Sequence, residues 1–298
     1  MPVAHPQIQP FLDYLKFEKR YSQNTIISYQ NDLLSFFDYL VLQYTEVKLP
    51  DITHHLIRSW LADLKGAEIT SKTINRKIST LRSFFKYEVK RGTLEQTPMT
   101  RILAPKSEKR LPLFVAEGDM DTLVRHVDFG EGLKGKTERL LLLLFYQTGM
   151  RLSEVVNLKE AGVHTSGCSL KVLGKGNKER VIPVSPELMD LLTGYMADKR
   201  LQGGSDEEYF FVNEKGSKLA LRSVYSIVKK YLTLVTTIEK RSPHILRHTF
   251  ATHLLNSGAD LNAVKELLGH SSLAATQVYT HNSIEKLKNV HQKAHPKA

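Results

Sequence analysis

His244 and Arg247 are spaced so that their side chains could bind one anion together. They lie in the stretch SPHILRH, in which Ser242 is suited to cap a helix and Pro243 to occupy its first turn, and the helix should end at Gly258. Residues three positions apart lie on one face of a helix, and the positive end of the helix dipole favours negative charge. This face is therefore expected to hold an anion.

The same helix allows two other interpretations. His244 and His248 stand at positions i and i+4, as two zinc ligands on a helix do. The metalloprotease pattern, however, needs a glutamate directly after the first histidine, where this chain has Ile245, and Arg247 would repel a cation. We expect no metal site, whereas a role of the histidines as capping or core residues stays open when this helix is considered by itself.

Other residues with suitable chemistry are spread along the second half of the chain. Arg151 follows a break at Gly149, where a new helix should start. Lys175 lies at the tip of an expected hairpin, among glycines, but the P-loop sequence G-x-x-x-x-G-K-[S/T] is absent. His270 follows the end of a helix at LLGH, and Tyr279 comes nine residues later.

These residues fall in an ordered series of motifs. The series is TGMRLSE with Arg151, LGKGNKERVIPV with Lys175, HILRHTFATHLL, LLGHSSLAATQVYTH, and the dipeptide His295-Pro296. It resembles the tyrosine recombinases of the phage integrase family, specifically the Xer group, over about residues 135–298 and in the family's order. The pattern HxxRH alone is weakly specific, whereas the ordered set is strongly specific and fills all six positions of the family's catalytic pattern.

The resemblance implies cutting and rejoining of duplex DNA through a 3′-phosphotyrosyl intermediate, with Tyr279 as the nucleophile. The ester keeps the energy of the broken bond, so that a DNA 5′-hydroxyl can later displace the tyrosine without ATP. A phenol has a pKa of about 10, so it needs help in losing its proton. Without the accompanying motifs, this tyrosine would be interpreted as a half-buried amphipathic side chain. The implied catalytic residues are Arg151, Lys175, His244, Arg247, His270 and Tyr279.

Arg151 and Arg247 are implied as a clamp on the phosphate. Guanidinium groups offer rigid forks of donors that match phosphate oxygens and neutralise the charge of the transition state. A surface ion pair, such as Arg151 with Glu154, is the structural alternative. Lys175 resembles the general acid that protonates the leaving 5′-oxygen, and Lys178 is close enough in sequence to be an alternative.

The histidines are implied to handle protons and phosphate oxygens. His244 would accept or relay the tyrosine proton, and His270 would hydrogen-bond a phosphate oxygen. Glu154 and His248 are expected to orient the arginine and the helix. No metal ion and no cofactor is expected, because the cationic side chains do what Mg²⁺ does in other phosphoryl-transfer sites.

Helices should position these residues in the N-terminal part. Ser22 is expected to cap a helix over Gln23–Tyr44, and Asp51 a second helix that stops at Gly66. A third helix is expected over residues 71–91, and its polar face is either a solvated surface or a DNA-binding one. In the second case the contact residues are Lys72, Asn75, Arg76 and Lys77.

The C-terminal part should combine helices with one small sheet. A helix is expected over residues 137–148, and a β-hairpin over residues 169–173 and 180–184. Helices return after about residue 219. The expected fold class is mainly α, with an N-terminal helical core-binding (SAM-like) domain and a C-terminal α-helical catalytic domain that contains a small antiparallel β-sheet.

The length of 298 residues exceeds the usual size of one hydrophobic core and predicts two domains. The segment over residues 98–112 is rich in proline and charge and reads as the boundary. We expect the core-binding domain at residues 1–103, a linker at 104–112 and the catalytic domain at 113–298.

Charge and composition point to the same partner. The net charge of +11 favours a polyanion such as DNA, although many basic proteins bind no nucleic acid. The single cysteine excludes an internal disulfide framework and suits a cytoplasmic location. No run of about 18 apolar residues and no signal-peptide pattern is present, so neither a membrane partner nor export is expected.

The Xer resemblance implies a homo- or hetero-tetramer on two recombination sites, in the mixed case with a paralogous recombinase, and a DNA translocase as a further partner. It also implies resolution of chromosome or plasmid dimers. Past Tyr279, Ser283 could cap a short helix with Ile284, Leu287 and Val290 in one apolar stripe, either buried on its own domain or donated to a neighbouring subunit.

Three alternatives remain. An integrase or transposase of a mobile element would use the same chemistry. A type IB topoisomerase would too, although the length and the Xer-like C-terminus argue against it. A DNA-binding regulator without catalysis is the alternative from another class, and the six filled catalytic positions argue against it.

Overall fold

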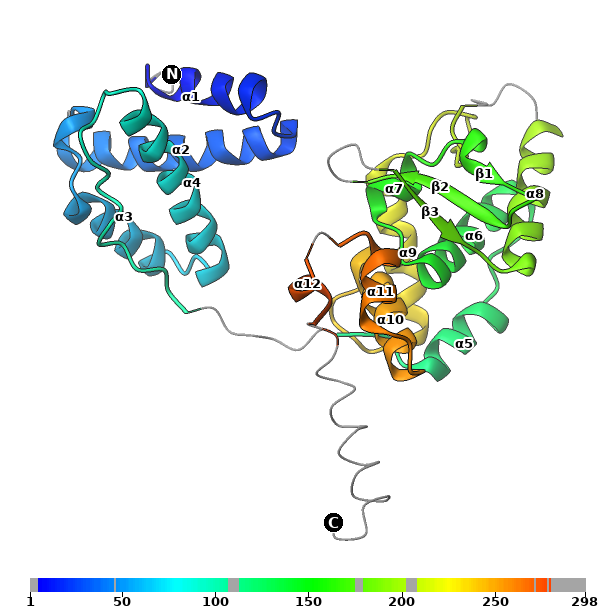
Figure 1. Cartoon of the computed structure of the whole chain (residues 1–298). Coiled ribbons are helices and arrows are strands. Elements are labelled where there is room, and N and C mark those ends of the chain that lie inside the picture. The colour runs from blue at the N-terminus through cyan, green and yellow to red at the C-terminus, as the bar shows by residue number, and fades with distance from the viewer. Residues whose placement is uncertain are drawn as a thin grey trace, which may run out of the picture. The chain divides into compact units, whose positions relative to one another are not determined.

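The chain divides into two compact units, Met1–Lys109 and Arg110–Ala298 (Figure 1). Most of the expected linker falls outside the residues described, so its bounds stay a prediction. Met99 and Ile102 are buried in the core of the first unit, so the proline-rich segment begins inside that unit. The computed structural model describes residues 5–45, 47–106, 113–174, 179–201, 208–270, 272–277 and 279.

The N-terminal unit is a helical bundle with an aromatic core. Phe11, Phe36, Trp60 and Phe84 are almost completely buried, and the ring of Phe36 meets that of Trp60 edge-on at 5.1 Å. Offset and edge-on ring contacts of this kind stabilise a core beyond the burial of area alone. The helices are α1 (Ile8–Asp13), a π-helical turn (Tyr14–Glu18), α2 (Gln23–Tyr44), a 3-10 turn (Leu49–Asp51), α3 (His54–Gly66) and α4 (Ser71–Lys90).

Two helix starts in the N-terminal unit test the capping predictions made for it. Ser22 caps α2 as expected, and its hydroxyl accepts a hydrogen bond from the backbone N–H of Thr25. Asp51 does not cap α3, because it ends the 3-10 turn and the N-cap is Thr53. The backbone of Ile52 and Thr53 is extended and the side chain of Ile52 is buried in the core, so the helix starts only after them.

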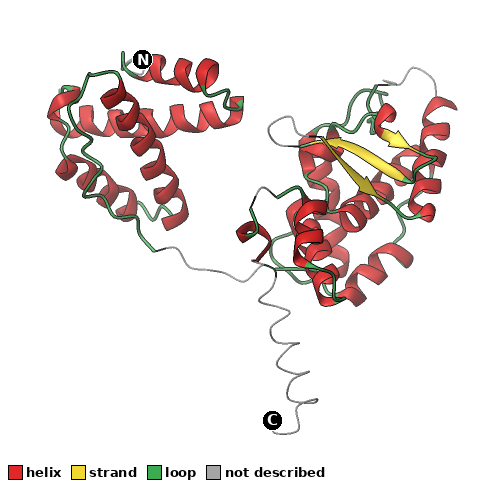
Figure 2. Ribbon diagram, viewed as in Figure 1, coloured by secondary structure: helices red, strands yellow, loops and turns green. Residues whose placement is uncertain are grey.

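The C-terminal unit is built around α6 (Gly132–Thr148). Its five leucines 140–144 and Phe145 are all buried, because α8, α9 and α10 pack against it. Figure 2 shows the helices of this unit together with its one small sheet. A helix that is apolar on every side is typical of the centre of a domain. The other helices are α5 (Glu117–Arg125), α7 (Leu152–Val156), α8 (Pro186–Leu201), α9 (Leu221–Val235), α10 (Pro243–Asn256), α11 (Leu261–Leu268) and α12 (Ala274–Gln277).

A small antiparallel sheet completes this unit. The expected hairpin is formed by β2 (Ser169–Leu173) and β3 (Glu179–Pro183), so the second strand begins one residue earlier than expected. The two-residue strand β1 (Val163–His164), too short for a sequence signal, pairs with β2. Leu170 lies opposite Ile182 with both side chains buried, which sets the inward face of the sheet.

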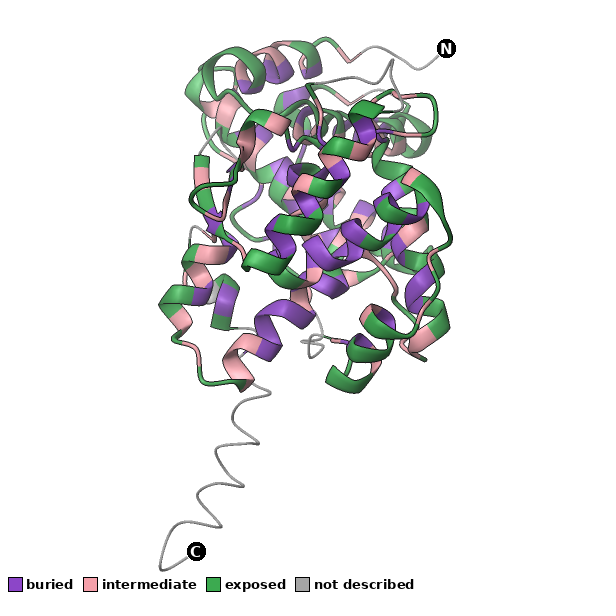
Figure 3. Ribbon diagram, turned by 90° about the vertical axis from the view of Figure 1, so that its right-hand side faces the viewer, coloured by how far each residue is buried: buried purple, intermediate pink, exposed green. Residues whose placement is uncertain are grey.

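The architecture confirms the expected fold class, mainly α with a small antiparallel sheet. Figure 3 shows helices that carry buried residues along one side and exposed residues along the other, as amphipathic spacing requires. None of the helices in the described part of the chain is long and apolar enough to cross a membrane.

Candidate active site

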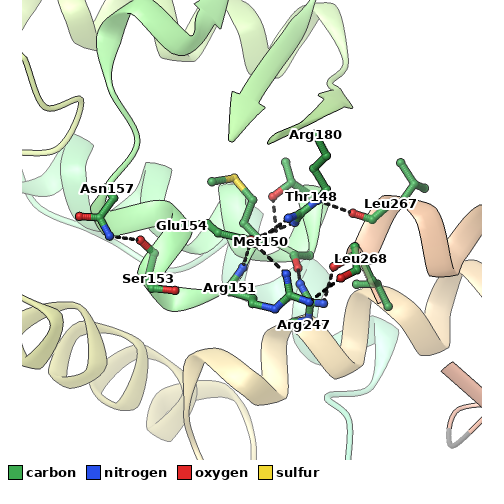
Figure 4. Close-up of polar contacts among 12 residues, drawn as sticks. Thr148, Met150, Arg151, Ser153, Glu154, Asn157, Arg180, Arg247, Leu267 and Leu268 are labelled. Atoms are coloured by element: carbon green, nitrogen blue, oxygen red, sulfur yellow. Dashed lines mark hydrogen bonds and ion pairs between the residues drawn. The ribbon is translucent and has the colours of Figure 1, made fainter. Parts of the chain in front are cut away.

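The carboxyl end of α11 holds arginines from three different elements (Figure 4). Three consecutive carbonyl oxygens each accept a hydrogen bond from a different guanidinium group. The pairs are Arg180 with Leu267 at 3.1 Å, Arg247 with Leu268 at 2.7 Å, and Arg151 with Gly269 at 2.8 Å. The last carbonyls of a helix lack intrahelical partners and carry partial negative charge, so this end of the helix favours cations.

Glu154 joins two of these arginines from the opposite side. Its carboxylate accepts hydrogen bonds from the backbone N–H of Arg151 at 2.7 Å and from its Nη1 at 2.8 Å. It also accepts two parallel bonds from Arg180, at 2.6 and 2.9 Å. Burial raises the pKa of Glu154, but the bonds from Arg180 and Arg151 outweigh that effect and lower it. The charged carboxylate, 1% exposed, fixes both guanidinium groups.

Gly149 determines where the chain turns between the end of α6 and Arg151, and it also contacts α10. It ends α6 in the left-handed conformation with a φ of 59°, so the chain turns sharply before Arg151. Its carbonyl accepts a hydrogen bond from Nη1 of Arg247. Burial and the neighbouring Arg151 lower the pKa of Arg247 to about 10, which leaves the side chain charged at neutral pH.

The hydroxyl of Tyr279 hydrogen-bonds Nδ1 of His248 at 2.7 Å. The tyrosine side chain is buried against Phe250, Val264 and Leu268. Burial raises the pKa of the Tyr279 phenol. Burial and nearby positive charge lower the pKa of His248 to about 4, so the imidazole is neutral at pH 7 and its Nδ1 can accept the phenol proton.

The other two histidines of the motif set lie near the arginines. Nδ1 of His270 is 2.9 Å from Oγ1 of the buried Thr276, and burial, followed by the charge of the arginines, lowers the pKa of His270 to about 4. His244 is exposed, and its pKa is also lowered, by burial of part of the ring and by Arg247. Among the described residues no hydrogen bond joins His244 to Tyr279, and no group of metal-ligating side chains gathers.

The structure brings several of the expected residues together. Arg151, Arg247 and His270 meet at the end of α11, and Tyr279 lies beside α10. Lys175 and Lys178 lie outside the described residues. The catalytic roles of all six expected residues stay predictions.

Sequence reasoning missed Arg180 and the contact of His248 with Tyr279. One signal pointed to Arg180: it occupies an inward position of a strand whose outward neighbours, Glu179 and Val181, are exposed. A charged side chain on the inward face of a strand needs a buried partner. No comparable signal marked His248, because its partner lies 31 residues further along the chain.

The DNA-facing residues expected on α4 differ in accessibility. Lys72 is exposed, and Arg76 is partly exposed while it bonds Asp32 and Ser28 of α2. Asn75 donates from its amide to the carbonyl of Pro105 at 2.9 Å.

Lys77 points inward. Its side chain is 11% exposed, pairs with Asp32 at 3.3 Å and lies over the ring of Trp60. Lys72 and Arg76 are therefore the two of the four whose charge reaches solvent. All four stay predictions as DNA contacts.

Comparison with known proteins identifies the protein family to which this fold and this arginine-rich site belong. Residues 114–286 match the phage integrase family, and residues 8–92 match the phage integrase N-terminal SAM-like domain. The chain belongs to the phage integrase family, the tyrosine recombinases.

The relatives specify the group within the family. The chain is 38% identical over 301 residues to tyrosine recombinase XerC of Pelotomaculum thermopropionicum, covering 98% of each protein. It is 37% identical to tyrosine recombinase XerC of Staphylococcus saprophyticus, covering 97% of each. The fold is similar to that of XerH site-specific recombinase in a post-cleavage complex with palindromic difH substrate, with 24% identity, a TM-score of 0.78, and coverage of 96% of this chain and 83% of that one. The expected Xer-like site-specific recombinase, a DNA strand-exchange enzyme, is confirmed.

Proposed function

We propose that this chain recombines duplex DNA at specific sites by moving a DNA phosphate onto Tyr279 and then onto a new DNA end. The observation that carries this proposal is the gathering of Arg151, Arg247 and His270 at the end of α11, with Tyr279 beside them. The complex of XerH with its difH substrate supports duplex DNA as the substrate.

The arginines would bind the scissile phosphate. Arg247 and Arg151 each direct two N–H groups at protein oxygens, and the remaining N–H groups of each guanidinium are available to phosphate oxygens. Donors fixed before the substrate arrives stabilise the charge of the transition state without reorganisation. Glu154 and the α11 carbonyls supply that fixation.

In the proposed reaction the oxygen of Tyr279 attacks phosphorus and the bond from phosphorus to the 5′-oxygen breaks. Lys175 would give a proton to that leaving oxygen, and His270 would hydrogen-bond a phosphate oxygen. The phenol proton has two candidate acceptors, His244 from the family resemblance and His248 from the observed hydrogen bond. Attack by a second 5′-hydroxyl then reverses the steps and rejoins the strand.

We infer the biological setting from the resemblance to the Xer group. Similarity to XerC proteins supports resolution of chromosome or plasmid dimers at cell division. The Xer resemblance also implies a tetramer on two DNA sites, of one chain or with a paralogous recombinase, and regulation by a DNA translocase. An integrase of a mobile element would use the same residues, and its chemistry would be identical.

Tyr279→Phe tests the proposal, because it removes one hydroxyl and keeps the buried ring. We expect DNA affinity in a gel-shift assay to change by less than about threefold, since phosphate contacts dominate such interfaces. The protein–DNA adduct that survives denaturant should disappear. Tyr225→Phe, at an exposed position of α9, is the control and should form the adduct at the normal rate.

Two outcomes would contradict the proposal. An adduct formed by Tyr279→Phe would assign the nucleophile to another residue. A parent chain that binds DNA and forms no adduct on any cleavable site would favour a DNA-binding regulator without catalysis.

A further inference from the structure

Arg180 is the most constrained cation of the site, although the proposed reaction gives it no role. Its guanidinium forms two parallel hydrogen bonds with Glu154, and its Nε donates to the carbonyl of Leu267. The side chain is 14% exposed, and Glu154 is almost completely buried. A bidentate arginine–carboxylate pair fixes direction as well as distance, so the pair holds β3 in one position.

The packing around Gly269 shows how closely Arg180 is held. A Cβ atom added at Gly269 would lie 3.1 to 3.3 Å from the guanidinium and Cδ of Arg180. The arginine therefore lies directly on the backbone of the turn that precedes His270. Because Gly269 also accepts the hydrogen bond of Arg151, this turn touches both guanidinium groups.

Arg180 also lies at the base of the hairpin. It is the second residue of β3, and β3 pairs with β2 through Leu173 opposite Glu179, the last pair before the hairpin tip. Lys175 lies two residues beyond Leu173 in this connection. Whatever fixes Arg180 therefore fixes the point from which the lysine-bearing tip extends.

We propose that Arg180 is a positioning residue that anchors the β2–β3 hairpin to Glu154 and the end of α11, so that the lysine at the tip reaches the leaving 5′-oxygen. The inference rests on the proposed function and deepens it. A misplacement of about 1 Å in a reacting group can cost about 10²-fold in rate. The donors of Arg180 that bond Glu154 and Leu267 serve this anchoring and not the phosphate.

The alternative is that Arg180 only neutralises Glu154 and so supports the clamp residue Arg151. The two roles predict different responses to the leaving group. A DNA strand with sulfur in place of the bridging 5′-oxygen leaves as a thiolate that needs no general acid. A defect in acid delivery is therefore rescued by sulfur, whereas a defect in phosphate binding is not.

The experiment compares Arg180→Gln with Lys175→Ala in the full chain, on oxygen and on sulfur substrates. We expect Arg180→Gln to slow cleavage of the oxygen substrate by about 10²-fold, with gel-shift affinity within about threefold, and to recover most of that loss on sulfur. The double variant should be barely slower than Lys175→Ala, because residues that act as a unit are not additive. Arg200→Gln is the control, since Arg200 forms a comparable but exposed ion pair with Glu160.

The outcomes separate this inference from the proposed function. Equal slowing of Arg180→Gln on both substrates, or no slowing, overturns the positioning role. Sulfur rescue of Arg180→Gln supports it whether Lys175 or Lys178 carries the proton, because either lysine lies on the same hairpin. Failure of the proposed function would appear instead as an adduct formed by Tyr279→Phe.

Arg180→Lys guards against a variant that fails to fold. It keeps the positive charge beside Glu154 but cannot form two parallel bonds to a carboxylate. We expect it to unfold at the same denaturant concentration as the parent and still to show the sulfur-rescued defect. Normal cleavage of the oxygen substrate by Arg180→Lys would show that charge alone suffices and would overturn the anchoring role.

Discussion

At the scale of single residues, the site contains ionisable groups held in a defined protonation state. Glu154 stays charged because Arg180 and Arg151 bond it, whereas His248 and His270 stay neutral because burial and nearby positive charge disfavour their protonation. The neutral His248 can thus accept the hydrogen bond of Tyr279. A charged Glu154 and neutral imidazoles at His248 and His270 fit the proposed reaction at neutral pH.

The lowered pKa values of His248 and His270 predict an acid-sensitive site. Both values are about 4, below the ordinary histidine value of about 6.5 that applies to the unfolded chain. As the pH falls from 6.5 toward 4, these histidines become protonated in the unfolded chain but stay neutral in the folded chain. The free energy of unfolding therefore decreases. His248 contributes up to about 1.4 kcal/mol per pH unit in this window. His270 is less buried and contributes less, because solvent screens its charge.

Urea unfolding at pH 7 and pH 5, followed by circular dichroism, measures this effect. His270→Gln should be less sensitive to acid than the parent, and so should His248→Gln. His126→Gln, at an exposed position after α5, should keep the parent's sensitivity. Equal sensitivity in all three variants would refute the assignment.

At the scale of elements, the end of α6 and the helix α10 determine where the arginines meet. Gly149 reverses the chain, and its backbone packs directly on the ring of Phe250. α10 in turn presents Arg247 to both Gly149 and the end of α11. A change at this junction therefore affects the whole site.

Gly149→Ala should destabilise the C-terminal unit by about 2 to 4 kcal/mol. The added Cβ would lie 2.4 Å from the Phe250 ring, and the φ of 59° is unfavourable for alanine. Gly194→Ala is the matched control, because nothing lies within 4 Å of its Cβ in the middle of α8, and a gain of up to about 1 kcal/mol is expected.

Circular dichroism in denaturant reports the loss, and the fluorescence of Trp60 separates the two units. Trp60 is the only tryptophan and lies in the N-terminal core, so its transition should be unchanged in Gly149→Ala. If Gly149→Ala were as stable as the parent, the prediction would be wrong, because α6 and α10 would then be able to move apart at no cost in the free energy of unfolding.

At the scale of the whole molecule, the two units divide the work of the proposed recombination. The N-terminal unit holds α4 against α2 through the buried carboxylate of Asp32, which accepts hydrogen bonds from Arg76 and Thr80 and forms an ion pair with Lys77. Lys72 and the exposed part of Arg76 therefore keep their charge at the surface, where the predicted DNA contacts would lie. The C-terminal unit carries the proposed chemistry.

The last residues are proposed to link one molecule to the next. Truncation after Asn282 removes the apolar stripe of Ile284, Leu287 and Val290, which lies outside the described residues. We expect single-site DNA binding to persist in a gel shift, while pairing of two sites and recombination are lost, because a donated helix joins neighbouring subunits. A truncated chain that recombines at the normal rate would contradict donation, and one that cannot bind DNA would support packing within its own subunit.

The sequence by itself determined the family and the types of the elements. The motifs run in order from Arg151 to Tyr279, and such an ordered set needs no structure to be recognised. Helix spacing and local capping are likewise properties of neighbouring residues, which is why Ser22 and the span of α2 were predicted correctly. Asp51 shows the limit of that reasoning. It does not cap α3, because Ile52 is buried in an extended conformation and the helix starts only after Thr53.

Only the tertiary structure decided how the charges are held. Arg180 meets Leu267 across 87 residues and Arg247 meets Gly149 across 98, and no local pattern contains both members of such a pair. In the same way, the side chain of Lys77 points inward because it pairs with Asp32, which lies on another helix. The type of a residue determines its chemistry, whereas tertiary packing determines which partner orients its side chain. A buried charge needs an opposite charge or a hydrogen-bond partner, and here these partners come from distant parts of the chain.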